Sequence, residues 1–169
     1  MKNAFKHVIL LIAILFTINL NAQESSVAQD APKSKTELVD EAKAQVSKMS
    51  ANTLKGKMSK NEKFILIDVR TEGEYLAGHI KGAVWIPRGK LEFVIQKVEE
   101  DPNAELVLYC RSGGRSALSV VTVMEMGYNN IYSLTGGFRE WTESGNHVFN
   151  RHGEIAVIAF EKKETEEEK

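Results

Sequence analysis

Residues 105–117 read ELVLYCRSGGRSA, a short apolar run followed by a polar loop that contains two glycines. The run from Glu105 to Tyr109 is too short for a helix and too uniformly apolar for a strand with one face in water, so it predicts a buried strand. The apolar spacing typical of a helix begins directly after the loop, at Ala117. This stretch therefore predicts a strand, a tight loop and the start of a helix in succession.

The same pattern extends to both sides of this stretch. Residues 64–69 form a second buried apolar run, and weaker runs at residues 46–49, 83–86 and 131–134 bring the expected number of strands to five. Helical stripes lie between them, at Leu91, Val94, Ile95 and Val98 and at Ala117, Val120, Val121 and Met124. We therefore expect an α/β fold with an open five-stranded parallel sheet, helices on both faces and a functional site at the carboxyl ends of the strands.

The composition excludes several classes of function. The 169 residues are 43% hydrophobic and 27% charged, as in an ordinary globular domain. The net charge of -1 provides no basic field to attract nucleic acid or an anionic membrane. Cys110 is the only cysteine, so an internal disulfide is excluded. A Cys/His zinc site would need histidines scattered from His7 to His152 to converge, so we expect no bound metal.

The two ends of the chain differ in composition from its middle. Residues 1–22 combine Lys2 and Lys6 with an apolar run shorter than the roughly 20 residues that span a bilayer, and they end at Ala22. This pattern predicts a cleaved signal peptide and a periplasmic or secreted protein with no stable membrane anchor; an uncleaved anchor is the alternative. We expect a polar lead and an N-terminal helix at residues 23–45, with Thr36 as N-cap, and a C-terminal extension with a charged tail at residues 146–169.

Cys110 is the main candidate for chemistry because it directly follows the predicted strand. Gly113 and Gly114 let successive backbone N–H groups turn inward as an anion-binding nest at the start of the helix. Arg111 and Arg115 add positive charge, which favours the nucleophilic thiolate and an anionic, sulfur-bearing or oxyanionic substrate. Other interpretations stay open, with Cys110 as a small buried hydrophobe and Arg111 as a surface salt-bridge partner. Arg115 is the better ligand candidate because its planar guanidinium can bind loop carbonyls or a bound oxyanion at two places at once.

Four motifs in order resemble the rhodanese (sulfurtransferase) family. They are Leu66-Ile67-Asp68-Val69-Arg70; Glu74-Tyr75 with Gly78-His79-Ile80-Lys81-Gly82-Ala83 and Ile86-Pro87; Tyr109-Cys110-Arg111-Ser112-Gly113-Gly114-Arg115-Ser116; and Leu134 with Gly136-Gly137 and Trp141. The resemblance implies a single-domain member whose rhodanese-like domain spans residues 46–145. It also implies the α/β domain of that family, with a five-stranded parallel sheet.

The resemblance further implies a mechanism and a set of site residues. The Cys110 thiolate would attack the sulfane sulfur of a donor such as thiosulfate, sulfite would leave, and the persulfide would pass its outer sulfur to cyanide, a thiol or a protein acceptor. The residues that would bind the anion are Arg111, Ser112, Gly113, Gly114, Arg115 and Ser116. Asp68 and Arg70 would support the cysteine loop, or, as the alternative, form an ion pair that only holds their own strand end. No metal or organic cofactor is required.

Two rival functions remain. Related phosphatases have five residues between the cysteine and the arginine, because a tetrahedral phosphate needs more room than a single sulfur. Here four residues, Arg111 to Gly114, separate Cys110 from Arg115, which disfavours phosphatase or arsenate reductase activity. The second rival is a persulfide carrier or sensor without turnover, or a protein-docking module. The presence of Cys110 and both arginines argues against docking alone.

Overall fold

The structure is a computed structural model in which residues 32–157 are described. The expected signal peptide at residues 1–22, the lead as far as residue 31 and the charged tail from Glu161 lie outside the described residues. None of the helices within the described range is long and apolar enough to cross a membrane.

Five parallel strands form the central sheet, as the sequence predicted. They are β1 (Ser47–Met49), β2 (Ile65–Asp68), β3 (Val84–Trp85), β4 (Leu106–Tyr109) and β5 (Ile131–Leu134), in the spatial order β1-β5-β4-β2-β3. All four neighbouring pairs are parallel. The strand that carries Cys110 at its end, β4, therefore lies at the centre of the sheet, where both of its edges are hydrogen-bonded.

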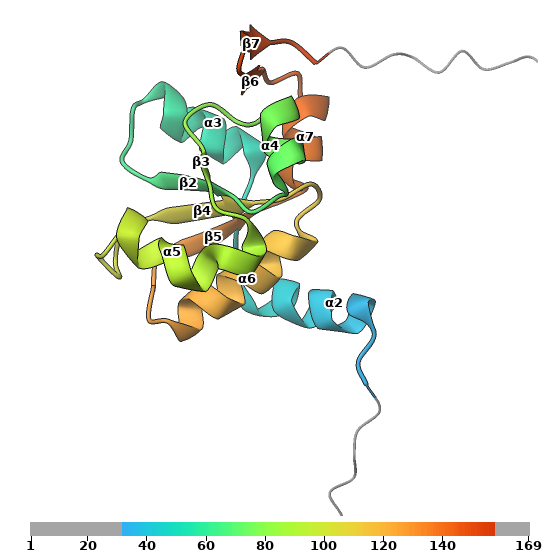
Figure 1. Cartoon of the computed structure of the whole chain (residues 1–169), viewed down its shortest axis with the longest axis vertical. Coiled ribbons are helices and arrows are strands. Elements are labelled where there is room, and N and C mark those ends of the chain that lie inside the picture. Colours follow the sequence, from blue (N-terminus) through green and yellow to red (C-terminus); the bar gives the residue numbers. More distant parts are fainter. Residues whose placement is uncertain (1–31, 158–169) are drawn as a thin grey trace, which may run out of the picture. The chain divides into compact units, whose positions relative to one another are not determined.

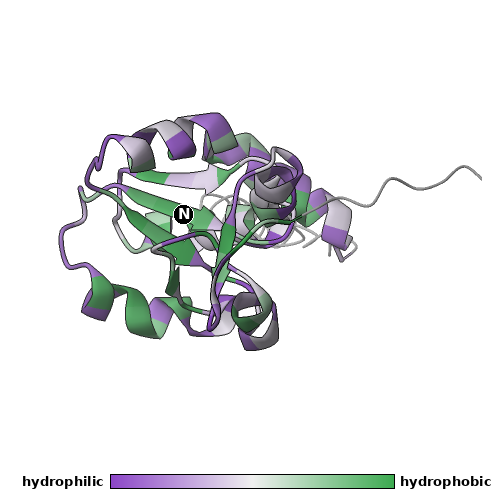
Figure 2. Cartoon of the chain, turned by 90° about the horizontal axis from the view of Figure 1, so that it is seen from above, coloured by the Kyte–Doolittle hydropathy of each residue, from purple (hydrophilic) through white to green (hydrophobic). Residues whose placement is uncertain are grey.

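The residues of β4 alternate between two hydrophobic cores, one on each face of the sheet. Leu106, Leu108 and Cys110 belong to one core, whereas Val107 and Tyr109 belong to the other. This alternation explains the uniformly apolar run, because a strand covered on both faces needs apolar side chains at every position. Figure 2 shows the hydrophobic residues concentrated in these central strands.

Helices cover both faces of the sheet (Figure 1). The first core is covered by α2 (Lys35–Gln45), α5 (Leu91–Val98) and α6 (Gly114–Glu125). The second is covered by α3 (Ala51–Ser59), α4 (Glu72–Ala77) and α7 (Gly137–Glu143). A short 3-10 turn, η1 (Arg88–Lys90), leads into α5. The predicted α/β architecture is therefore confirmed.

Two predicted helix starts are wrong. The N-cap of α2 is Ser34 rather than Thr36, because the Ser34 hydroxyl accepts a hydrogen bond from the Glu37 N–H while the Glu37 carboxylate accepts one from the Ser34 N–H. The helix after the cysteine loop begins at Gly114 rather than Ala117, since Gly113 already turns the chain with φ +93°. Arg115 and Ser116 consequently lie in the first turn of α6 rather than in an open loop.

The chain after the domain forms an antiparallel hairpin of β6 (Val148–Asn150) and β7 (Gly153–Ile155). Phe149 exchanges two backbone hydrogen bonds of 2.8 Å with His79, and Val148 is buried in the second core. The described part of the extension is therefore attached to the segment between α4 and β3.

Candidate active site

Cys110 lies directly after β4, at the carboxyl end of the sheet. Cys110 is only 1% exposed, and its Sγ accepts a hydrogen bond of 3.2 Å from the Gly113 N–H. The left-handed conformation of Gly113 allows this N–H to turn back toward the sulfur, a conformation that glycine adopts without steric cost. One amide of the expected anion-binding nest therefore contacts the thiol.

Two buried serines lie beneath the sulfur. The Ser116 Oγ is 3.8 Å from the Cys110 Sγ, 3.1 Å from the Gly113 carbonyl oxygen and 2.8 Å from the Ser133 Oγ. A hydroxyl has one proton to donate, so Ser116 can donate to the sulfur when the Ser133 hydroxyl donates to Ser116. The two hydroxyls can therefore turn so that Ser116 donates a hydrogen bond to the sulfur when the sulfur is negatively charged.

The N-terminus of α7 holds the cysteine loop through backbone hydrogen bonds. The Phe138 N–H donates to the Cys110 carbonyl at 2.8 Å, and the Arg139 N–H donates to the Arg111 carbonyl at 3.0 Å. Gly137 makes this approach possible, because a Cβ there would lie 2.4 Å from the Cys110 carbonyl oxygen and its φ is +61°. These backbone contacts were not predicted, although the Gly136-Gly137 pair was their sequence signal.

Arg115 binds Glu74 of α4 rather than a loop carbonyl. Its two terminal nitrogens donate to the two Glu74 oxygens at 2.8 and 2.7 Å, and Thr71 donates two further hydrogen bonds to the same carboxylate. The Arg115 hydrogen bonds lower the Glu74 pKa from 4.5 to about 2, and Glu74 in turn raises the pKa of Arg115. The Arg115 guanidinium therefore lies beside the site with its charge already partnered.

Asp68 and Arg70 lie apart from the thiol. The Arg70 guanidinium donates to both Asp68 oxygens at 2.7–3.0 Å and to the Gly78 carbonyl at 2.6 Å, and it stacks 4.0 Å from the centre of the Phe138 ring. Burial acts to lower the pKa of Arg70, but the hydrogen bonds and charge of Asp68 outweigh burial and raise it. Neither side chain hydrogen-bonds to the loop 110–116 within the described residues. The pair therefore holds its own strand end and the Gly78 carbonyl, and it reaches the cysteine loop through Phe138, whose N–H donates to the Cys110 carbonyl.

A cavity of about 500 Å³ opens onto Cys110. Of the predicted site residues, Arg111, Ser112, Gly114 and Arg115 line it together with the cysteine. Gly113 and Ser112 line a neighbouring cavity of about 220 Å³. The sequence did not predict that α2 side chains also line the cysteine cavity, because residues 23–45 were expected to lie outside the domain.

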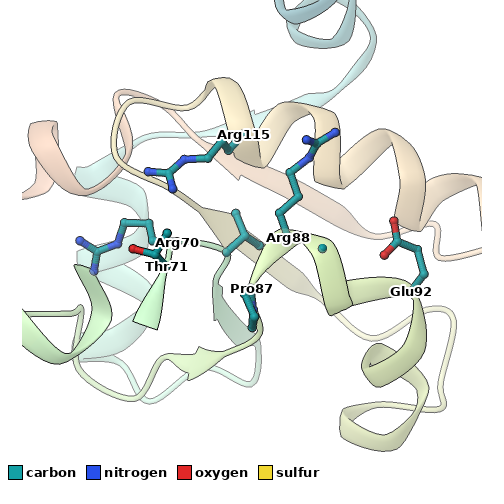
Figure 3. A pocket seen from close by; sticks show the side chains of 8 residues that line it. Arg70, Thr71, Pro87, Arg88, Glu92 and Arg115 are labelled. Carbon is teal, nitrogen blue, oxygen red and sulfur yellow. The ribbon is translucent and has the colours of Figure 1, made fainter. Parts of the chain in front are cut away.

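Another cavity, of about 480 Å³, has Arg70, Thr71, Pro87, Arg88, Glu92 and Arg115 among its lining residues (Figure 3). Arg88 and Arg115 line both this cavity and the cysteine cavity. The Arg70 guanidinium points away from Arg88 in this view, consistent with its pairing to Asp68. Within residues 32–157, no cluster of three or more His, Cys, Asp or Glu side chains could hold a metal ion.

Comparison with known proteins gives a consistent result. A sequence profile described as the Rhodanese-like domain matches residues 50–144. A sulfurtransferase from Allochromatium vinosum is 29% identical over 100 residues, which cover 59% of this chain and 92% of that protein. Some relatives are longer than this chain. YrkF from Bacillus subtilis is 32% identical over 97 residues, which are 57% of this chain but only about half (51%) of that protein.

Solved structures share the fold. A polysulfide-sulfur transferase homodimer from Wolinella succinogenes has a TM-score of 0.58 at 33% identity, covering 67% of this chain and 85% of that one. A protein from Rhodopseudomonas palustris, described as of unknown function and a possible tyrosine phosphatase, has a TM-score of 0.64 at 25% identity, covering 72% and 98%. With its parallel sheet, its cysteine at the end of the central strand and a profile match over more than half of its length, the chain belongs to the rhodanese-like domain family.

Proposed function

We propose that this protein is a sulfurtransferase that moves a sulfane sulfur from an anionic donor such as thiosulfate to a thiophilic acceptor through a persulfide on Cys110. The observation that carries the proposal is the placement of the Cys110 sulfur. It lies on a cavity rich in cationic side chains and accepts the Gly113 N–H at 3.2 Å. Membership of the rhodanese-like family and the A. vinosum sulfurtransferase support the same reaction class.

The first half-reaction transfers the sulfur to the enzyme. The Cys110 thiolate attacks the outer sulfur of thiosulfate, a new S–S bond forms, and the S–S bond within the donor breaks. Sulfite leaves with the electron pair of that bond. The Gly113 N–H and the Ser116 hydroxyl are positioned to hydrogen-bond the anionic sulfur, while Arg111 and Arg115 lie where they can attract the donor and departing sulfite.

The second half-reaction returns the free thiolate. The acceptor, cyanide in an assay or a thiol in the cell, attacks the outer persulfide sulfur, and the Cys110 thiolate leaves with the bonding pair. Because sulfite departs before the acceptor reacts, the kinetics should be ping-pong. Within the described residues, no other cysteine is present to share the sulfur.

The test is turnover of thiosulfate and cyanide by the wild type and by Cys110→Ser. We expect parallel double-reciprocal lines for the wild type and no turnover for the variant, because serine cannot carry a sulfane sulfur. Thermal unfolding serves as the control, since exchanging sulfur for oxygen at one buried position should leave the domain folded. Wild-type turnover by Cys110→Ser would overturn the proposal.

We further propose that the protein is exported. Support comes from the sequence pattern of residues 1–22, two lysines followed by a short apolar run and a small residue at Ala22. Expression of the full chain in a bacterium should yield a protein whose N-terminal residue is close to Gln23, as determined by mass spectrometry. A cell-associated protein that retains Met1 would contradict export with cleavage.

A further inference from the structure

The helix α2 precedes the part of the chain that matches the family profile, yet it contacts the cysteine loop. The profile begins at residue 50, whereas α2 ends at Gln45. A Cβ on Gly114 would lie 3.3 Å from a Val39 methyl group, so the helix packs directly against the first turn of α6. Ala42 belongs to the same hydrophobic core as Cys110, and the Ser34 capping box defines the start of the helix. The position of α2 is therefore fixed by packing.

The polar side of α2 forms one wall of the cysteine cavity. Lys35, Asp40 and Lys43 line this cavity, and Lys43 also lines the smaller cavity on the other side of Ser112. Lys43 is the only α2 residue shared by the two cavities, so its side chain lies beside the cysteine loop at both openings. It is partly buried, and it forms no ion pair within residues 32–157.

The charges that line the cavity indicate that Lys43 helps to attract anions into it. Arg115 is partnered by Glu74, so its attraction for an incoming anion is reduced. The other cationic residues that line the cavity are Lys35, Lys43, Arg88 and Arg111, and its only acidic lining residue is Asp40. A cleft lined by an excess of one charge concentrates ligands of the opposite charge. The volume of about 500 Å³ lies within the ordinary range for a small-molecule site.

We propose that α2 is a specificity element of this site and that Lys43 binds the oxyanion part of the donor, the sulfonate oxygens of a dianionic sulfur compound. Its role in turnover rests on the proposed function, but the binding of a sulfur oxyanion does not. Asp40 has the opposite effect and limits the affinity of the same site for anions. Neither residue lies within the family profile, so this selectivity belongs to the segment before the domain.

The experiment measures sulfite binding by isothermal titration calorimetry to the full chain carrying Cys110→Ser, which cannot react covalently. Adding Lys43→Gln should weaken binding about three- to tenfold, as expected for a half-buried charge beside an anion. Adding Asp40→Asn should strengthen it about twofold, a smaller effect because Asp40 is exposed. The matched control is Lys97→Gln, which makes the same charge change at an exposed position of α5 that lines none of the cavities described above. It should leave the affinity unchanged.

Opposite shifts for the Lys43 and Asp40 variants, with no shift for the Lys97 variant, would support the inference. Circular dichroism establishes that each variant keeps its helices. An unchanged affinity on Lys43→Gln would overturn the inference, and so would an absence of sulfite binding to the parent protein. Formation of a persulfide by the wild type is measured separately. A protein that binds sulfite through Lys43 but forms no persulfide would overturn the proposed function and leave the role of α2 intact.

Discussion

Two arginine–carboxylate pairs lie near the carboxyl end of the sheet, and they differ mainly in burial. Both have a shortest contact of 2.7 Å. The side chains of Arg70 and Asp68 are 4% and 0% exposed, whereas those of Arg115 and Glu74 are 36% and 31% exposed. The same chemical pairing can therefore serve as part of a core or as part of a site.

The difference in burial determines what each pair can do. Arg70 is surrounded by the Asp68 carboxylate, the Gly78 carbonyl and the Phe138 ring, and its side chain is only 4% exposed although the residue is among those that line the cavity of about 480 Å³. Arg115 borders two cavities and remains in contact with solvent. An anion in the cysteine cavity can therefore compete with Glu74 for Arg115, whereas Arg70 does not line that cavity and is held by its buried partners.

The largest expected effect is on the stability of the buried pair. Arg70→Ala leaves the Asp68 carboxylate buried without its main partner, which should lower the free energy of unfolding by about 3–5 kcal/mol. Urea unfolding followed by circular dichroism measures the change. The double variant Asp68→Ala/Arg70→Ala should lose less than the single variant, because it removes the unpaired charge. A loss from Arg70→Ala comparable to that of a surface substitution would remove the contrast between the two pairs.

An intermediate effect is expected at the cysteine cavity. Arg115→Ala should lower kcat/KM for thiosulfate by about tenfold, because a charge-assisted contact to the donor is lost. Its effect on the free energy of unfolding should be about 1 kcal/mol or less, since the pair is partly exposed. Arg139→Ala is the control, because that exposed side chain lines neither cavity. Unchanged kinetics on Arg115→Ala would give Arg115 a purely structural role.

The smallest effect is the pH dependence that Glu74 contributes to stability. Its pKa is about 2 in the folded protein, against 4.5 ordinarily, because Arg115 stabilises the carboxylate. The ionised form therefore stabilises the fold fully above pH 4.5, and this contribution declines as the pH falls through 4.5 toward 2. Glu74→Gln should accordingly lose less stability than the wild type over that interval in acid titrations of the unfolding midpoint. Identical acid profiles would show that Arg115 does not hold Glu74 ionised.

The sequence predicted those features that repeat along one element. The apolar runs of β2 and β4, the stripe of α5 and the placement of Cys110 at a strand end each depend on residues close together in the chain. It also raised both roles for Asp68 and Arg70, because residues two apart at a strand end can pair locally. The α3 segment shows no such signal, since its two lysines, its glycine and its other polar residues leave a weak apolar stripe.

The features that were missed depend on distant parts of the chain. Glu74 and Arg115 are separated by 41 positions and meet only because α4 and α6 begin at the same edge of the sheet. The α7 contacts to the cysteine loop use backbone N–H groups, which side-chain patterns do not report. The wall formed by α2 could not be predicted because nothing in residues 35–45 indicates which part of the fold they pack against.

The central claim is that Cys110 carries the transferred sulfur. The most direct measurement is the intact mass of the reduced protein after brief incubation with thiosulfate, with Cys110→Ser treated in parallel. The account predicts that the wild type gains the mass of one sulfur atom, that cyanide removes it, and that the variant gains nothing. A wild-type thiol that reacts with an alkylating agent but acquires no sulfur, or a variant that acquires it equally, would contradict the claim.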